Sequence, residues 1–236
     1  MKILAIESSG SVASAAILED KNVLVEKLGP FKVTHSETLM PLINECFNEA
    51  LCRPDDMDLI AVSGGPGSFT GLRIGSATAK GLGFALDKTL VHVPTLDAMA
   101  MNFYGSDKII IPLMDARRGQ VYTGVYSFEN GKLITHMKSC AMAAEELMDT
   151  VNAENDGTAV IFLGDGLEPS RAVIEEKADF PYEFAEGVNA LQRAASVGIL
   201  GYSLALEGKT VSAADEAPEY LRPSQAERVR AEQAGK

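Results

Sequence analysis

The chain has 236 residues, of which 46% are hydrophobic and 23% are charged. These proportions are typical of a globular protein and exclude disordered and collagen-like classes, and at about 150 residues per domain the length allows one large or two modest domains. The 21 basic and 33 acidic residues give a formal net charge of −12. This charge opposes binding to nucleic-acid phosphates over the surface as a whole, so a role on RNA predicts a basic partner that carries the RNA.

Membrane insertion and disulfide stabilisation are not expected. No apolar run approaches the roughly 18–20 residues that a membrane helix needs, and Met1 leads directly into a strand-like segment without the basic stretch and cleavage site of a signal peptide. The cysteines are Cys46, Cys52 and Cys140, an odd number without a CxxC pair. They fit reduced thiols, and we expect a cytosolic protein.

The amino-terminal quarter predicts three strands followed by a helix. Strand-like segments cover residues 2–9, 12–20 and 22–28, and the polar turn between the last two predicts a hairpin within a meander. Thr34-His35-Ser36-Glu37 fits a capping box in which the Thr34 side chain accepts from an amide and Glu37 reaches back. Apolar residues at helical spacing then predict a buried stripe, with Pro41 either kinking the helix or marking a later start; the stripe is Leu39, Leu42, Ile43, Cys46, Phe47, Ala50 and Leu51.

A buried strand over residues 58–63 leads into a glycine-rich loop and a second helix over residues 72–86. Interior glycines cost a helix about 0.5–1 kcal/mol each relative to alanine, so a helix that keeps several of them implies close packing against another backbone. The small residues of this helix are Gly75, Ser76, Ala77, Ala79, Gly81, Gly83 and Ala85.

The remaining elements predict two α/β lobes with mixed sheets, because strands precede helices in both halves. A polar break at residues 104–107 suggests an amino-terminal lobe over 1–105, a carboxy-terminal lobe over 106–223 and a disordered tail over 224–236. The expected strands are 89–94, 109–114, 121–128, 132–137 and 159–163, and the expected helices are 96–103, 143–152, 168–177 and 189–207.

The loop from Gly64 to Gly71 is the strongest candidate for an anion or nucleotide site, because amides at a strand-to-helix junction bind phosphate well. Neither the P-loop nor the dinucleotide-binding spacing is matched, however. A tight turn whose glycines only permit close packing explains the loop equally well. Acidic and hydroxyl groups at the end of the first strand could join such a site, which would then comprise Glu7, Ser9, Gly65, Gly67, Ser68, Thr70 and Gly71.

Other candidate residues carry weaker signals. Asp115, Arg117 and Arg118 form a predicted polar turn that either contacts a carboxylate or phosphate, or is simply solvated. The histidines lack metal-ligand spacing, and His35 is expected on the surface of the first turn of its helix. No nucleophile–base pair for a peptidase can be assembled from the sequence.

Five segments together resemble the TsaB family, also called YeaZ, of bacterial tRNA threonylcarbamoyladenosine biosynthesis proteins. They are IESS at the start, THSETLMPLI, GGPGSFTGLRIG, MDARRGQVY and PEYLRP near the end, so the resemblance spans residues 1 to about 223. The resemblance implies a two-lobed actin-like fold (ASKHA, ribonuclease H-like), with mixed β-sheets flanked by helices.

The resemblance also implies the biological role. The related catalytic subunit, TsaD, transfers a threonylcarbamoyl group to the adenosine beside the anticodon of tRNAs that read codons beginning with A. TsaD carries metal-binding histidines on its early helix, whereas the matching helix here has His35 alone, so no metal site and no catalytic residue are expected. A TsaB protein is a non-catalytic scaffold that activates TsaD and cooperates with TsaE, meeting tRNA only through the complex, with ATP or ADP expected only there.

A scaffold of this kind needs a docking surface, and the two early helices are the predicted one. They would pair with TsaD, or with a second copy in a homodimer, as a helical bundle. The residues expected at this interface are Leu39, Ile43, Gly75, Ala79 and Gly83, although core packing explains each of them as well. The alternative function is an autonomous ATPase or phosphotransferase that uses Glu7 and the glycine-rich loop.

Overall fold

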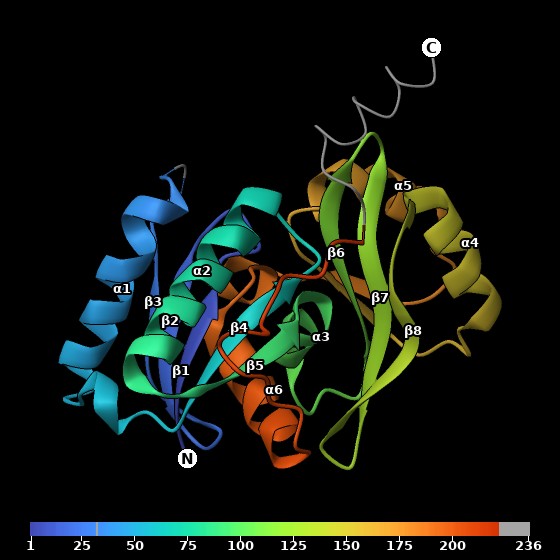
Figure 1. Ribbon diagram of the computed structural model, residues 1–236. Coiled ribbons are helices and arrows are strands. Elements are labelled where there is room, and N and C mark those ends of the chain that lie inside the picture. Colours follow the sequence, from blue (N-terminus) through green and yellow to red (C-terminus); the bar gives the residue numbers. More distant parts are fainter. Residues whose placement is uncertain (32, 222–236) are drawn as a thin grey trace.

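The computed structural model describes residues 1–31 and 33–221 and contains two five-stranded mixed sheets, one in each lobe (Figure 1). The first sheet has the order β3-β2-β1-β4-β5. Its strands are β1 (Lys2–Glu7), β2 (Ser14–Glu19), β3 (Asn22–Leu28), β4 (Leu59–Gly65) and β5 (Thr89–Pro94). Strands β1, β2 and β3 pair antiparallel, whereas β1–β4 and β4–β5 pair parallel. The predicted meander and the mixed character of the sheet are confirmed.

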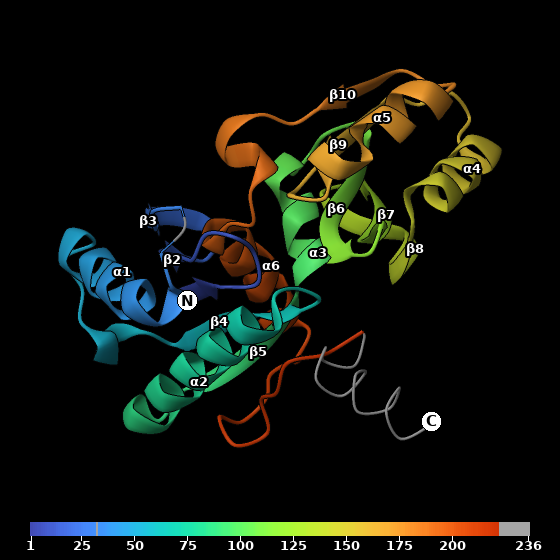
Figure 2. The same ribbon diagram turned by 90° about the horizontal axis from the view of Figure 1, so that it is seen from above.

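Helices cover both faces of the first sheet (Figure 2). Along β1, Leu4 and Ile6 pack toward α1 (His35–Glu49) and α2 (Phe69–Leu86), and the intervening Ile3 and Ala5 pack against α6 (Ala194–Leu206). Successive side chains of a strand point to opposite faces, so a strand that is apolar throughout needs a helix layer on each side.

Helix α1 begins at the predicted residue but not through the predicted cap. The Thr34 side chain makes no capping hydrogen bond; instead the Thr34 carbonyl accepts from the Glu37 amide at 3.0 Å and the Thr38 hydroxyl at 3.2 Å. The helix continues through Pro41. Most of the predicted stripe is buried, but Leu51 lies beyond the last turn and is 92% exposed. Its place in the stripe was wrong because the helix ends at Glu49.

Helix α2 begins three residues before the expected start at Leu72, at Phe69. The Ser68 hydroxyl accepts from the Gly71 amide at 3.3 Å. A serine at this position satisfies one of the amides that the first turn leaves without an intrahelical partner. The carboxyl half of the glycine-rich loop is therefore helix.

The second sheet has the order β10-β9-β6-β7-β8. Helices α4 (Ala144–Glu154) and α5 (Leu167–Lys177) cover its outer face, and α3 (Thr95–Ala100) packs between the two sheets. Strand β10 had no sequence signal, because it has only three residues, of which two are partly buried and Glu183 is exposed. The strands are β6 (Ile109–Arg117), β7 (Gln120–Glu129), β8 (Lys132–Ala143), β9 (Val160–Leu163) and β10 (Tyr182–Phe184), and the short 3-10 helices are Pro54–Asp56, Met101–Phe103 and Gly187–Ala190.

The last helix returns to the first lobe. Ala194, Val197 and Leu200 of α6 share an apolar cluster with strands β1, β2, β4 and β5. The range 106–223, expected for the second lobe, thus contributes one helix to the first. The tail from residue 224 onward lies outside the described residues. Among the described helices, none is both long and apolar enough to cross a membrane.

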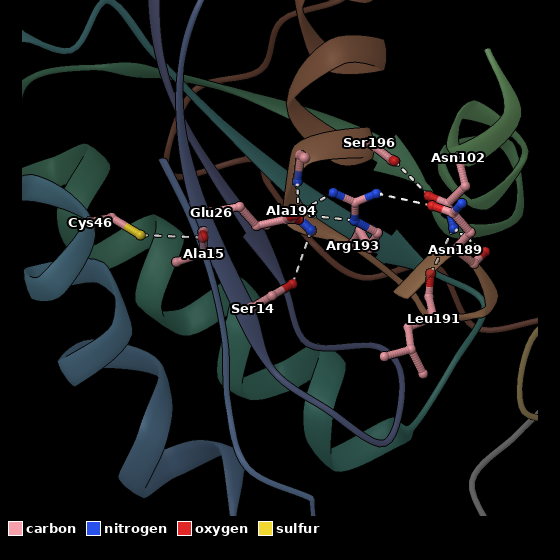
Figure 3. Close-up of polar contacts among 11 residues, drawn as sticks. Ser14, Ala15, Glu26, Cys46, Asn102, Asn189, Leu191, Arg193, Ala194 and Ser196 are labelled. Atoms are coloured by element: carbon pink, nitrogen blue, oxygen red, sulfur yellow. Dashed lines mark hydrogen bonds and ion pairs between the residues drawn. The ribbon is translucent and has the colours of Figure 1, made fainter. Parts of the chain in front are cut away.

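Polar side chains from the first sheet hold the amino terminus of α6 in place (Figure 3). The Ser14 hydroxyl accepts from the Ala194 amide at 2.9 Å, and Glu26 accepts from the Ala195 amide at 2.8 Å. Glu26 also forms an ion pair with Arg193. A carboxylate at the positive end of a helix dipole is favourable, so these side chains act as caps that come from another element.

Candidate functional site

A cleft of about 540 Å³ lies between the two lobes. One wall is the β1–β2 loop with residues 66–70 and Leu72, and the opposite wall comes from the ends of β6 and β9 and the start of β7. Residues 219–221 complete the lining. The cleft therefore brings together two segments that the sequence analysis treated separately, the glycine-rich loop and the turn after β6.

The glycine-rich loop packs directly on the end of the first strand. The Ser68 amide donates to the Ser9 carbonyl at 2.7 Å. A Cβ atom on Gly67 would lie 2.6 Å from the Ser9 Cβ, and one on Gly71 would lie 2.0 Å from the Ser8 carbonyl oxygen. Because the chain itself fills the space beside these glycines, the packing interpretation of the loop accounts for both of them.

The structure separates the seven predicted anion-site residues into two groups. Ser9, Gly67, Ser68 and Thr70 line the cleft, whereas Glu7, Gly65 and Gly71 do not. Glu7 is 1% exposed and accepts a hydrogen bond from the Ser9 amide beneath the loop. Burial raises the pKa of the Glu7 carboxyl, and hydrogen bonds from Ser9 and Ser63 offset part of that rise. Glu7 therefore supports the loop from below and does not face the cleft.

The Ser9 hydroxyl is a buried polar group at the first wall, beside the Glu7 carboxyl. Its Oγ makes no well-aligned hydrogen bond within the described chain, but its contact with Glu7 offsets part of the rise in the pKa of that carboxyl. A buried hydroxyl without a well-aligned partner costs free energy, so it could also bond to a ligand at this wall. The amino terminus of α2 reaches the cleft at the same wall, and its dipole favours an anion there.

The opposite wall carries carboxylates. Asp115 accepts from the Arg117 amide at 2.7 Å and pairs with the Arg117 guanidinium at 3.0 Å. Both residues line the cleft, whereas Arg118 is exposed outside the lining. The predicted turn was too long: β6 continues to Arg117, and only Arg118-Gly119 turns, with φ values of 57° and 72°.

Asp165 was missed by the sequence analysis, although it lines the cleft. Its side chain accepts from the Asp115 amide at 3.4 Å. Partial removal from water, together with the nearby Asp115 carboxylate, raises the pKa of Asp165. Its place in the Gly164-Asp165-Gly166 turn, directly after β9, could have indicated a site residue. Side chains that follow parallel strands lie together at one edge of a sheet, and β9 is parallel to β6.

The last described segment, Val211–Leu221, is a strap that runs beside α2 to the cleft (Figure 2). Its first residue pairs with Leu90 of β5, and Glu219, Tyr220 and Leu221 form part of the cleft lining. A second pocket, of about 350 Å³, lies on the other side of these residues beside Asp97 and Ser139. In the sequence, this segment contributes only part of the motif PEYLRP, which belongs to the family resemblance.

The five predicted interface residues are buried inside the first lobe. Leu39 and Ile43 of α1 are each 1% exposed, and Ala79 of α2 belongs to the same apolar cluster. A Cβ on Gly75 would lie 2.1 Å from the Ser8 hydroxyl oxygen, and one on Gly83 would lie 2.5 Å from Leu90 Cδ1. These residues pack the helices onto their own sheet, so a partner on the same helices must contact the opposite face.

The histidines are dispersed. His35 is half-buried and its Nε2 donates to the Gly10 carbonyl at 2.9 Å, in contrast to the expected surface position. His92 lies 3.7 Å from Glu216, and His136 bonds to Ser127 at 2.7 Å. Within residues 1–31 and 33–221, no three His, Cys, Asp or Glu side chains are grouped closely enough to hold a metal ion.

The cleft thus presents hydrogen-bond donors on one wall and carboxylates on the other. Ser9, Ser68 and Thr70 face Asp115 and Asp165 across it. This arrangement suits a ligand with an anionic group and a bound cation, such as a phosphate with its divalent metal. Among the described residues that line the cleft there is no histidine, cysteine or lysine, so they offer no nucleophile paired with such a base.

Comparison with known proteins shows which family the chain resembles. Residues 31–229 match a family model described as TsaD, tRNA N6-adenosine threonylcarbamoyltransferase. The chain is 34% identical over 230 residues to the tRNA threonylcarbamoyladenosine biosynthesis protein TsaB of Bacillus subtilis, covering 96% of each chain. It is 26% identical over 226 residues to TsaB of Escherichia coli, covering 94% of this chain and 95% of that one.

Solved structures share the fold. YeaZ from Pseudomonas aeruginosa superposes with a TM-score of 0.78 at 24% identity, over 93% of this chain and 99% of that one. Component A of the (R)-2-hydroxyglutaryl-CoA dehydratase of Acidaminococcus fermentans gives 0.52 at 14% identity, over 87% and 99% of the two chains. The ROK hexokinase of Thermus thermophilus gives 0.50 at 13% identity, over 88% and 100%. The two lobes therefore have the actin-like ASKHA fold, as expected.

Proposed function

The chain belongs to the TsaB (YeaZ) family of tRNA threonylcarbamoyladenosine biosynthesis proteins, and from this membership we propose that it is the non-catalytic scaffold that binds and activates TsaD. In this role it takes part in tRNA threonylcarbamoyladenosine formation in the cytoplasm. TsaD performs the transfer to the adenosine beside the anticodon, and TsaE cooperates with the pair. The observation that carries the proposal is the 34% identity over 96% of both chains to a TsaB protein.

The outward face of α2 is the docking surface that we propose. Its exposed residues recur along the helix, and Gly81 has nothing within 4 Å of the position that a Cβ would occupy. A glycine in the middle of a helix lowers the stability of the helix, and here no neighbour within the chain requires it. A glycine at this position would let a helix of another subunit approach the backbone closely. The face consists of Thr70, Arg73, Ala77, Gly81 and Phe84, of which Phe84 is 65% exposed.

Helix α1 extends the same surface. It packs beside α2 on one face of the first sheet (Figure 1). Its Met40 is 48% exposed. Two adjacent helices can form a four-helix bundle with a similar pair, and here α2 offers small outward residues while α1 offers Met40 among polar ones. A related subunit of the same fold offers such a pair, and in its absence a second copy of this chain would fill the place as a homodimer.

The net charge of −12 supports an indirect relation to tRNA. A tRNA-binding surface gains most of its affinity from cations that neutralise phosphates, and this chain has 33 acidic residues against 21 basic ones. In this proposal TsaD carries the tRNA, and the scaffold contributes through its contacts with TsaD.

The test is reconstitution with a matched pair of variants. Purified TsaD, TsaE, tRNA, ATP and the threonylcarbamoyl donor are assayed for modified tRNA with and without this chain, and the TsaD complex is sized by gel filtration. We expect the wild type to form the complex and to stimulate modification. Ala77→Arg, on the exposed face of α2, should abolish both, because a long cation cannot enter a close helix contact.

The control is Ala172→Arg, the same substitution at an exposed position of α5 on the other lobe. It should bind TsaD as the wild type does, and both variants should keep the wild-type melting temperature. The proposal fails if the wild type neither binds TsaD nor stimulates it. The docking face fails if the variant at Ala77 binds as tightly as the control.

The alternative is an autonomous ATPase or phosphotransferase, and the cleft is the observation that favours it. Two carboxylates, Asp115 and Asp165, face the amino terminus of α2 there. Hydrolysis of ATP by the chain alone, lost on Asp165→Asn, would support this function. Glu7→Ala, the variant that the sequence suggests, is a poorer test because Glu7 is buried beneath the loop and its loss disturbs packing.

A further inference from the structure

The strap, Val211–Leu221, has two parts that are held to the protein by different kinds of contact. Its beginning is part of the first lobe, because Val211 and Leu90 exchange two backbone hydrogen bonds of 2.8 and 2.9 Å and Ala213 is buried in the apolar core. Residues 214–221 contribute no member to the apolar clusters of the described chain. What holds this second part is a short series of polar contacts and one ring contact.

Glu216 makes the buried contacts of this part. Its side chain is fully buried, accepts from the Ser76 hydroxyl of α2, and lies 3.7 Å from His92 of β5. Lys80 of α2 donates to the Glu216 carbonyl at 2.8 Å and to the Ala214 carbonyl at 3.2 Å. A carboxylate in a protein interior is stable only while such partners surround it, and it regains hydration when it leaves.

The end of the strap rests on the loop at the cleft. The Glu219 amide donates to the Gly64 carbonyl at 2.7 Å. The Tyr220 ring lies 4.7 Å from the Phe69 ring, and its hydroxyl accepts from Arg73 Nε at 3.2 Å. Glu219 and Leu221 line both interlobe pockets, so this part of the strap is the partition between them.

We propose that residues 214–221 are a movable partition of the interlobe cleft, with Glu216 as the latch that holds it closed. Opening breaks the polar contacts to α2, β5 and the glycine-rich loop but exposes no apolar core, so it occurs without unfolding of the lobe. When the latch is open, the two pockets become one groove that joins Ser9 and Asp165 to Asp97 and Ser139. Val211 and Ala213 remain in place and act as the hinge end.

Amide hydrogen exchange of the full chain tests the movement. In the wild type we expect the Glu219 amide to exchange about 100-fold faster than amides in β1 and β4, through local opening. The Leu90 amide, bonded to Val211, should exchange as slowly as those strands. Equal exchange at Glu219 and in β1 would show that the strap opens only when the lobe unfolds, and would overturn the proposal.

The latch is tested with Ser76→Ala, which removes the hydroxyl that bonds to Glu216 and leaves the strap sequence unchanged. We expect exchange at Glu219 to rise a further ~10-fold, as for a loss of about 1.4 kcal/mol, with no change at Leu90. The control is Ser170→Ala on α5, which removes the hydroxyl of another buried serine far from the strap. A rise at Glu219 of the same size in the control, or none in the latch variant, would reject Glu216 as the latch.

A fluorescent reporter gives an independent measurement. The chain contains no tryptophan, so Tyr220→Trp places a single indole on Phe69. Adding Ser76→Ala to this variant should shift the emission to longer wavelength and strengthen quenching by acrylamide. Unchanged emission and quenching, with folding intact by circular dichroism, would count against the movable partition whatever the exchange data show.

Discussion

Gly75 of α2 lies so close to Ser8 of the β1–β2 loop that a Cβ at Gly75 would come 2.1 Å from the Ser8 hydroxyl oxygen. That hydroxyl donates to the Gly71 carbonyl at 2.9 Å and so cannot turn away without losing its bond. The helix therefore depends on a glycine at this point to reach its own sheet. This contact explains a helix glycine by packing inside the lobe, one of the two explanations, beside a partner interface, that the sequence left open.

Gly75→Ala is expected to destabilise the isolated chain by about 1–3 kcal/mol, because Ser8 or the helix must move to admit the methyl group. Gly81→Ala on the same helix is the control, and it should stabilise the chain by up to about 1 kcal/mol, since nothing surrounds Gly81 and alanine favours helix. Urea unfolding monitored by circular dichroism measures both. Equal effects of the two substitutions would contradict this account of α2.

Glu26→Ala should cost about 2–4 kcal/mol, because it leaves the largely buried Arg193 and the amide of Ala195 without their partner. Glu49→Ala removes a carboxylate that pairs with Lys27 at the surface and should cost less than about 1 kcal/mol. Thermal or urea unfolding of the two variants compares them. If Glu26→Ala lowers the free energy of unfolding no more than Glu49→Ala does, the amino terminus of α6 does not need this cap.

The buried Glu7 predicts a pH-dependent effect of Glu7→Gln. Burial raises the pKa of Glu7 above its ordinary value of 4.5, so its contribution to stability is greatest below that pH and declines as the pH rises through the folded-state pKa. Glutamine keeps an oxygen that can accept from the Ser9 amide and does not titrate. The stability of the variant relative to the wild type should therefore increase as the pH rises from 4.5 to 8.

Urea unfolding at a series of pH values measures this difference, and its slope with pH is the diagnostic quantity. Glu19→Gln, at an exposed carboxyl on β2, serves as the control. A difference between the variant at Glu7 and the wild type that stays constant, or falls, as the pH rises would contradict the raised pKa.

Cys46 should be inert in the folded chain. Its thiol is fully buried and donates to the Ala15 carbonyl at 3.3 Å, and burial raises its pKa to about 12 (Figure 3). Cys52 and Cys140 are half-buried free thiols. Alkylation of the native chain followed by intact mass measurement should give at most two labels, with the third added only in denaturant. Labelling of Cys46 in the folded state would show that α1 detaches from the sheet.

Much of the fold could be predicted because the relevant signals are local. Short apolar segments separated by turns indicated β1, β2 and β3, and helical spacing placed Leu39, Ile43 and Phe47 on the buried side of α1. Two mixed sheets followed from the order of strands and helices. The return of α6 to the first sheet was not predicted, because a helix that is apolar nearly all round does not reveal which sheet it covers.

The candidate site was predicted only in part. Ser9, Gly67, Ser68 and Thr70 came from the chemistry of a strand-to-helix loop, and Asp115 with Arg117 came from charge in a turn. That these segments face each other across one cleft has no local signal. Asp165 and the strap were missed for the same reason, since each acquires its role from a neighbour that is distant in the chain.

The sequence by itself determined most of the elements, most of the apolar faces of the strands and helices, and the family, because these depend on residue order and spacing. The tertiary structure alone decided which face of α2 is available to a partner. Gly75 and Gly81 are the same residue type on one helix. Ser8 lies beside Gly75, so packing requires a glycine there, whereas nothing lies within 4 Å of the position that a Cβ at Gly81 would occupy. The physical reason is that a glycine has no side chain to mark its environment, so the neighbour that the fold brings to it defines its role.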